Sequence, residues 1–193
     1  MDTLTPVFVF RHPALMVPSL YRGANSISGW EPGDEDFEIS TTLRWNQYLY
    51  DYFVARGRRP AVIEAQDFVY NTRPIMDKLC RHLGIDESGW SEKWHPLPKE
   101  HWPDHKIAMA MTGDAMASSG LERRAKGVSV APLLSNAVSI LTVEEPVEST
   151  LDLDTETENW RAQWGDKIAQ GMRTRVDAEM PTYEYLKSVK LRA

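Results

Sequence analysis

Two polar residues follow the first apolar run of the chain. Residues 7–10 are all apolar, Arg11 and His12 come directly after them, and Pro13 opens a helical pattern that reaches residue 22. A short apolar run of this kind predicts a buried strand. A charge that ends such a strand in an α/β fold lies at the carboxyl edge of the sheet, where these folds bind their ligands. We therefore expect a ligand site at Arg11 and His12.

Ser19 lies eight residues after Arg11. An arginine at a strand end and a serine two helical turns later can hold the same phosphate from two sides. The arginine offers a planar charged fork, and the serine offers a hydroxyl. Arg11 and Ser19 are therefore the predicted phosphate ligands, if a 3′-phosphate is bound.

Four further residues complete the set of catalytic candidates, which is Arg11, His12, Tyr48, Glu64, Asp67 and His95. Within this set a histidine or a carboxylate can shuttle a proton, and an arginine can polarise a carbonyl. Tyr48 belongs to a strongly aromatic segment whose rings either wall a pocket or pack in the core. For each residue taken singly, a structural role is the alternative.

The segment from Thr5 to Arg22 resembles the conserved core of the sulfotransferase branch of the P-loop fold. In that family a strand ends in Arg-x-Pro and a serine follows, as Arg11, Pro13 and Ser19 do here. Residues 60–85 resemble the family's later strand and helix, and residues 90–102 and 180–188 also look like parts of its bacterial and fungal members. The resemblance implies that Arg11 and Ser19 hold the 3′-phosphate of 3′-phosphoadenosine 5′-phosphosulfate (PAPS).

One part of the family pattern is not matched. The family's phosphosulfate-binding loop and catalytic histidine precede the Arg-Ser motif, whereas only four residues precede Thr5, and no G-x-x-x-x-G-K-[ST] loop occurs in the chain. Sulfuryl transfer needs that loop to neutralise the leaving phosphate. We therefore expect an N-terminally shortened protein that has lost its nucleotide chemistry.

The preferred functional interpretation is a cofactor-independent cyclase or isomerase, with pericyclases included. It would act on a small apolar specialised metabolite in an aromatic-lined pocket, by holding one conformer and stabilising charge as it develops. The first alternative is a PAPS-dependent sulfotransferase, either a fragment or completed by a partner chain. The second is a non-catalytic binding or assembly protein, and a homodimer is compatible with each interpretation.

The elements that must position these residues alternate between strand and helix patterns. We expect a reduced, helix-rich α/β fold of the P-loop type, with three layers and a small, mainly parallel sheet. One domain would cover residues 1–193, with long loops at 23–40 and 86–106 over the pocket. The remaining expectations are a helix at 41–56, a strand at 61–65, a helix from residue 72 that ends at Gly84, a buried helix at 107–117, a replacement edge strand within 128–141, and one helix from residue 155 that ends at Pro181.

Composition limits the classes of partner. The 193 residues carry 28 acidic and 22 basic side chains, for a net charge of −6 and a pI near 5.4, which argues against nucleic acid or anionic membranes as partners. Cys80 is the single cysteine, so a cytoplasmic protein without disulfides is expected. His101 and His105 are four residues apart, but Pro103 lies between them, and we expect no metal site.

Overall fold

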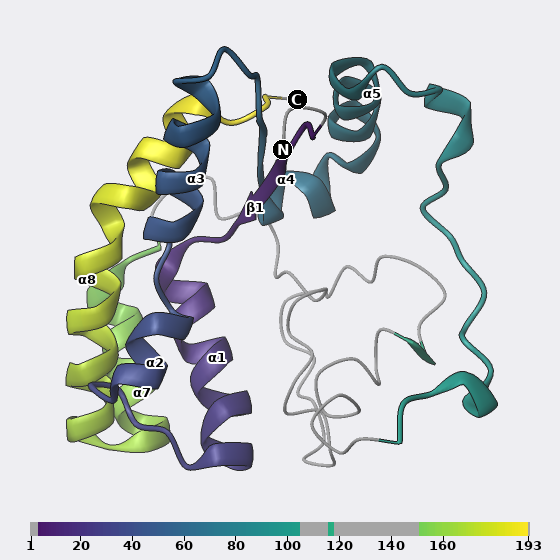
Figure 1. The fold of residues 1–193 in the computed structure, drawn as a ribbon. Coiled ribbons are helices and arrows are strands. Elements are labelled where there is room, and N and C mark those ends of the chain that lie inside the picture. The colour runs from purple at the N-terminus through teal and green to yellow at the C-terminus, as the bar shows by residue number, and fades with distance from the viewer. Residues whose placement is uncertain (1–3, 105–115, 118–150, 193) are drawn as a thin grey trace.

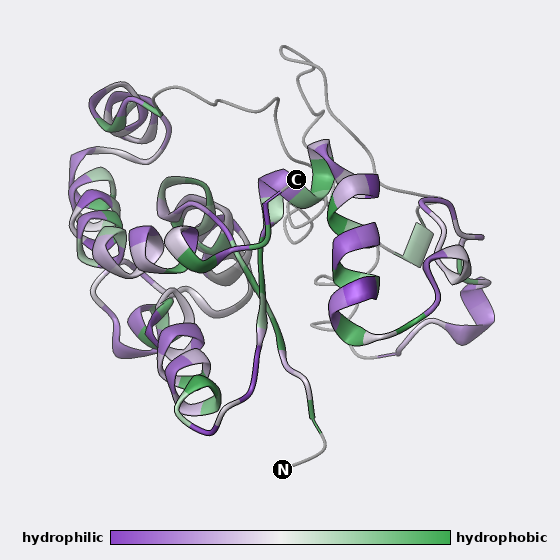
Figure 2. Ribbon diagram, turned by 90° about the horizontal axis from the view of Figure 1, so that it is seen from above, coloured by the Kyte–Doolittle hydropathy of each residue, from purple (hydrophilic) through white to green (hydrophobic). Residues whose placement is uncertain are grey.

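Two parallel strands form the centre of the described structure, which is a computed structural model covering residues 4–104, 116–117 and 151–192. Strand β1 (Val7–Phe10) pairs with β2 (Ala61–Glu64), so that Val7 faces Ala61 and Phe10 faces Glu64. Helices flank the strands on both sides (Figure 2). The predicted helix-rich α/β class with a small parallel sheet is confirmed.

Helix α1 (Pro13–Ser28) follows β1 and packs along the long helix α8 (Asp166–Val189) (Figure 1). The face of α1 that carries Ala14, Val17 and Tyr21 is buried against α8. These residues are three or four apart, which places them on one side of a helix. This contact fixes α1, and with it the residues at the end of β1, relative to the rest of the chain.

The loop expected at residues 23–40 is wrong in part. Helix α1 continues to Ser28 and ends at Gly29, whose φ of 70° is left-handed, and helix α2 (Glu35–Ser40) occupies the end of the segment. The glycine, serine and acidic residues suggested a loop, but burial of Phe37, which is 0% exposed, stabilises α2. Trp30 packs against the same core.

The middle of the chain follows the sequence pattern closely. Helix α3 (Arg44–Val54) lies within the predicted range, and β2 runs directly into the short helix α4 (Ala65–Tyr70). Helix α5 (Thr72–Leu83) ends at Gly84, whose φ of 69° gives the expected left-handed cap. Beyond α5 the chain is irregular up to residue 104, apart from the one-turn helices η1 (Glu87–Gly89) and η2 (Lys99–His101). The predicted helix at 107–117 and edge strand at 128–141 lie outside the described residues, except for 116–117.

The last predicted helix is in fact two helices. Helix α7 (Leu153–Trp164) and α8 are separated by Gly165, whose φ of 83° and ψ of 169° break the helix. Helix α8 also passes through Pro181 rather than ending there. Burial of Tyr183 and Leu186 beyond the proline outweighs the cost of a proline inside a helix, about 3 kcal/mol.

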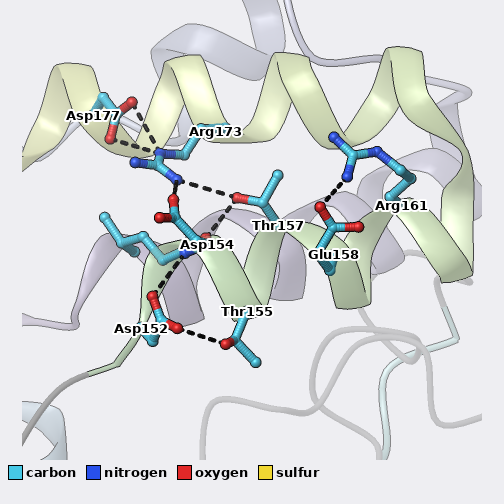
Figure 3. A network of polar contacts seen from close by, with 9 residues as sticks. Asp152, Asp154, Thr155, Thr157, Glu158, Arg161, Arg173 and Asp177 are labelled. Carbon is cyan, nitrogen blue, oxygen red and sulfur yellow. Dashed lines mark hydrogen bonds and ion pairs between the residues drawn. The ribbon is translucent and has the colours of Figure 1, made fainter.

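An exposed polar network joins α7 to α8 (Figure 3). Arg173 of α8 contacts Asp154 at 2.7 Å and Asp177 at 3.0 Å, and Asp152 caps the first turn of α7. Because Asp154 and Arg173 are 19 residues apart in sequence, this contact requires α7 to fold back along α8. No helix in the described part of the chain combines the length and the apolar character that a bilayer span requires.

Candidate functional site at the carboxyl ends of the strands

Both strands end in polar residues at the same edge of the sheet. Arg11 and His12 follow β1, while Glu64 is the last residue of β2 and Asp67 lies in the first turn of α4. Parallel strands in this register place Phe10 beside Glu64, so the residues that follow both strands are neighbours. Four of the six catalytic candidates thus lie at the predicted edge.

Glu64 is the centre of a buried polar cluster. The residue is only 6% exposed, and its Oε1 accepts a hydrogen bond from the Tyr183 hydroxyl at 2.6 Å. Lys190 forms an ion pair with Glu64 and a second one with Oδ2 of Asp67 at 2.6 Å. Tyr183 lies in α8, and Lys190 is the first residue after that helix. The cluster therefore also connects the end of α8 to the sheet.

His12 lies beside this cluster and caps helix α1. Its Nδ1 accepts a hydrogen bond from the backbone N–H of Ala14 at 3.1 Å, and its ring packs edge-on against Tyr183 with centroids 4.7 Å apart. Burial lowers the pKa of His12, and the nearby charge of Glu64 offsets this only partly. A neutral imidazole with its proton on Nε2 satisfies this geometry.

Two groups of this cluster, Tyr183 and Lys190, have raised pKa values. Burial, followed by the hydrogen bond to Glu64, raises the pKa of Tyr183 well above its usual range. Burial alone would lower the pKa of Lys190, but its hydrogen bonds to Asp67 and Glu64 outweigh that effect and raise it. At neutral pH Tyr183 is therefore a hydrogen-bond donor and Lys190 a cation, and both carboxylates are matched by partners.

Arg11 lies in the connection between β1 and α1, and Ser19 lies within α1. Both side chains are half-buried. The Ser19 hydroxyl makes no hydrogen bond to the residues that the structure describes. No acidic residue lies in the first turn of α1, where the helix dipole favours an anion, but Glu64 and Glu184 lie near the N-cap residue His12. This arrangement is chemically suited to a phosphate ester.

Two candidates lie elsewhere. Tyr48 is 58% exposed on α3, where its ring contacts Trp45, and His95 is exposed in the irregular segment after α5. No described contact joins either side chain to the cluster at Glu64. The aromatic-lined pocket expected around all six candidates is thus not found among the described residues, and the catalytic roles of the six stay predictions.

Sequence reasoning missed the contribution of α8 to the site. Tyr183 and Lys190 are more than 115 residues from Glu64 in sequence, and no local pattern predicts a contact over that separation. An acidic strand end followed by a helix start was the available signal, because a buried carboxylate requires a partner. Within the described residues, no three His, Cys, Asp or Glu side chains are placed to hold a metal ion.

Comparison with known proteins relates the chain to two fungal proteins. It is 26% identical over 207 residues to sulfotransferase ppzF of Metarhizium majus, a match that covers 99% of the chain and 54% of the relative. The protein of the same name from Metarhizium rileyi is 24% identical over 207 residues, which again cover 99% of the chain and 54% of the relative. The chain spans about half the length of these curated relatives. No family model and no solved structure matches it.

These matches confirm the predicted sulfotransferase-like relationship. They extend over almost the whole chain, whereas the resemblance in the sequence was most evident at residues 5–22 and 60–85. They do not assign a reaction to this chain.

Proposed function

We propose that this chain binds the 3′-phosphate of an adenosine 3′,5′-bisphosphate nucleotide, as part of a PAPS-dependent sulfotransferase. The single observation that carries the proposal is the position of Arg11 and Ser19. They lie on a β1–α1 unit at the carboxyl edge of a parallel pair, in a chain related along its length to sulfotransferases.

Charge at this edge is compatible with an anion. The carboxylates of Glu64 and Asp67 are both paired with Lys190, and Arg11, which directly follows β1, brings a further positive charge to the same edge. Glu184 and Lys187 also act on His12, with opposite signs. Three carboxylates (Glu64, Asp67 and Glu184) and three cations (Arg11, Lys187 and Lys190) thus balance one another near this edge, so an approaching phosphate meets no net negative charge. Arg11 would bind two phosphate oxygens through its planar fork, and Ser19 would donate one hydrogen bond.

His12 has a supporting role in this proposal. Its Nδ1 holds the first turn of α1 in place, because it accepts the otherwise unsatisfied N–H of Ala14. A fixed first turn sets the direction of α1 and hence the position of Ser19 relative to Arg11. PAPS, when bound, supplies the sulfuryl group, and the residues proposed here bind and orient its nucleotide.

The test is calorimetric titration with adenosine 3′,5′-bisphosphate and, in parallel, with adenosine 5′-monophosphate, which lacks the 3′-phosphate. We expect the bisphosphate to bind more tightly. Arg11→Ala should weaken bisphosphate binding by about ten-fold or more and remove most of the difference between the two nucleotides, since a charge-assisted hydrogen bond is worth about 1.5–3 kcal/mol. Ser19→Ala should weaken it by a few-fold.

Arg44→Ala is the matched control, because Arg44 is an exposed arginine at the start of α3. Equal affinity for the two nucleotides, or an Arg11→Ala variant that binds like the unmodified protein, would contradict the proposal. If neither nucleotide binds, the cyclase or isomerase hypothesis becomes the next to test, by screening small apolar metabolites for a protein-dependent change in product distribution. Light scattering on the same samples tests the predicted homodimer.

A further inference from the structure

A polar hollow lies at the amino ends of the two strands, opposite the edge that carries Arg11 and Glu64. It has a volume of ≈ 390 Å³ and is open to solvent. Thr5 precedes β1 and the turn at residues 57–59 precedes β2, so the hollow adjoins the amino ends of both strands. Its lining residues are Thr5, Gly57, Arg58, Arg59, Arg81 and His82.

The cations of this hollow come from two separate elements. Arg81 and His82 belong to the last turn of α5, where the helix dipole favours positive charge. Arg58 and Arg59 come from the turn after α3, so the dipole does not account for them. The ring Nε2 of His82 lies 2.6 Å from the backbone oxygen of Arg59, and this contact fastens the turn to α5.

Positive charge in the hollow exceeds the negative charge that could balance it. Arg81 contacts Glu87 at 3.2 Å and the Asp77 carbonyl at 3.1 Å, and both contacts use Nε, which leaves its terminal nitrogens for a ligand. Arg58 and Arg59 form no ion pair with the residues that the structure describes. Three guanidinium groups around one hollow repel one another unless an anion joins them. The whole chain has more acidic than basic residues, so this excess of positive charge is confined to the hollow.

We propose that this hollow binds the tetrahedral anionic group of a small organic phosphate or sulfate monoester. Guanidinium groups bind such oxyanions through paired hydrogen bonds, and the Thr5 hydroxyl can add another. The hollow has room for about a dozen water molecules, far more than one oxyanion occupies, so an organic group can enter with it. Volumes of this size are ordinary for sites that bind small molecules.

The hollow is separate from the proposed nucleotide site. Each strand has four residues, which at about 3.3 Å per residue places about 13 Å of sheet between the two ends. Arg11 and Ser19 lie beyond the carboxyl end, and Arg58 and Arg59 lie before the amino end. The two sites can therefore be tested independently.

Phenyl phosphate is the probe for the test, with phenyl sulfate, inorganic phosphate and neutral phenol in parallel titrations of the 193-residue chain at low salt. Arg11 and Ser19 could also bind the phosphate of this probe, so each titration is run on the Arg11→Ala variant as well. In that variant we expect saturable binding of phenyl phosphate with a ratio of one, weaker binding of inorganic phosphate, and none of phenol. The double variant Arg58→Gln with Arg59→Gln should bind phenyl phosphate at least about ten-fold more weakly. In nuclear magnetic resonance spectra, the Nε–H signal of Arg81 should shift on addition of the probe.

The matched control is Arg44→Gln with Arg192→Gln, which removes the same charge from positions outside the hollow. An equal loss of affinity in both double variants would show a general charge effect and overturn the proposal, as would the absence of saturable binding up to about 10 mM. Inorganic phosphate that binds as tightly as phenyl phosphate would also overturn it, because the organic group would then contribute nothing. In the Arg11→Ala variant the proposed phosphate site at the carboxyl edge is removed. Phenyl phosphate binding that persists in this variant, and is lost when Arg58→Gln and Arg59→Gln are added, therefore reports on the hollow alone, so failure of one site does not decide the other.

Discussion

Glu179 shows how one buried side chain holds three helices in place. It is 0% exposed on α8, and its Oε2 accepts the backbone N–H of Leu43 at 2.6 Å, which caps the first turn of α3. Its Oε1 accepts from the Thr42 hydroxyl at 3.1 Å and pairs with Arg175. Arg175 in turn donates to the hydroxyl of Thr41, which follows α2. The carboxylate is thus fully satisfied, as burial of a charge requires.

Removal of Glu179 should destabilise the fold strongly. In Glu179→Ala the guanidinium of Arg175 and the N–H of Leu43 lose their partner, and we expect a loss of about 3–5 kcal/mol in the free energy of unfolding. Urea denaturation followed by circular dichroism measures it. Glu184→Ala, at an exposed position of the same helix, should change the value by less than about 0.5 kcal/mol. Similar losses in both variants would contradict this account of Glu179.

His12 should make stability depend on pH. Burial lowers its pKa in the folded protein below the ordinary value of 6.5, so the unfolded chain binds a proton at a higher pH than the folded chain does. The contribution of neutral His12 is therefore fully present above about pH 6.5 and declines as the pH falls from there towards the folded pKa. The slope from one such group is at most about 1.4 kcal/mol per pH unit.

His12→Gln should remove this part of the pH dependence. Urea denaturation at a series of pH values between about 5 and 8 gives the slope for both proteins. The variant should lose less stability than the unmodified protein on acidification through this range, whatever its stability at neutral pH. Parallel curves would show that His12 is not the group responsible. Asp86 and Asp152, whose pKa values are lowered by local hydrogen bonds, titrate well below this range.

At the scale of elements, the turn between α7 and α8 decides how the C-terminal half packs. Gly165 has a φ of 83° and a ψ of 169°, a conformation that residues with a Cβ rarely adopt. The turn allows α7 to lie along α8, where Trp160 joins the core formed with Met172 and Val176. A continuous helix would carry Trp160 away from that core.

Gly165→Ala should therefore cost about 1–3 kcal/mol in the free energy of unfolding, because the strained backbone must be kept for α7 to pack. Thermal or urea denaturation measures the loss. Gly89→Ala is the control, since Gly89 has ordinary backbone angles and an added Cβ would meet nothing within 4 Å. An unchanged stability of Gly165→Ala would mean that the turn can relax without cost.

At the scale of the whole molecule, the end of α8 joins the core to the sheet. One buried cluster lies between α1 and α8 and a second joins the end of α8 to the strands, and Met16 and Met180 pack against both of them. Tyr183, Leu186 and the paired Lys190 then extend this packing onto β2. The two proposed anion sites lie at opposite ends of the same pair of strands, so their ligands need not compete.

Local patterns in the sequence predict the elements of the β1–α1 and β2–α5 segments and the sheet edge at which the polar candidates lie. The apolar runs at residues 7–10 and 61–64, the glycine that ends α5 and the Arg11–Ser19 spacing are all local features, and local patterns predict them well. The same features carried the resemblance to sulfotransferases that the relatives confirm. Such patterns predict that Arg11, His12, Glu64 and Asp67 lie at the carboxyl edge. They do not predict which side chains these residues contact.

The tertiary structure decided which side chains meet across the chain. Glu64 bonds to Tyr183 at a separation of 119 residues, and Glu179 caps a helix 136 residues away, and no periodic pattern encodes such contacts. The same holds for α2 and for the passage of α8 through Pro181, because burial of Phe37 and Leu186 outweighs the local preference for a loop or a helix end. Both proposed anion sites likewise depend on tertiary structure, because each is formed by elements that are distant in sequence.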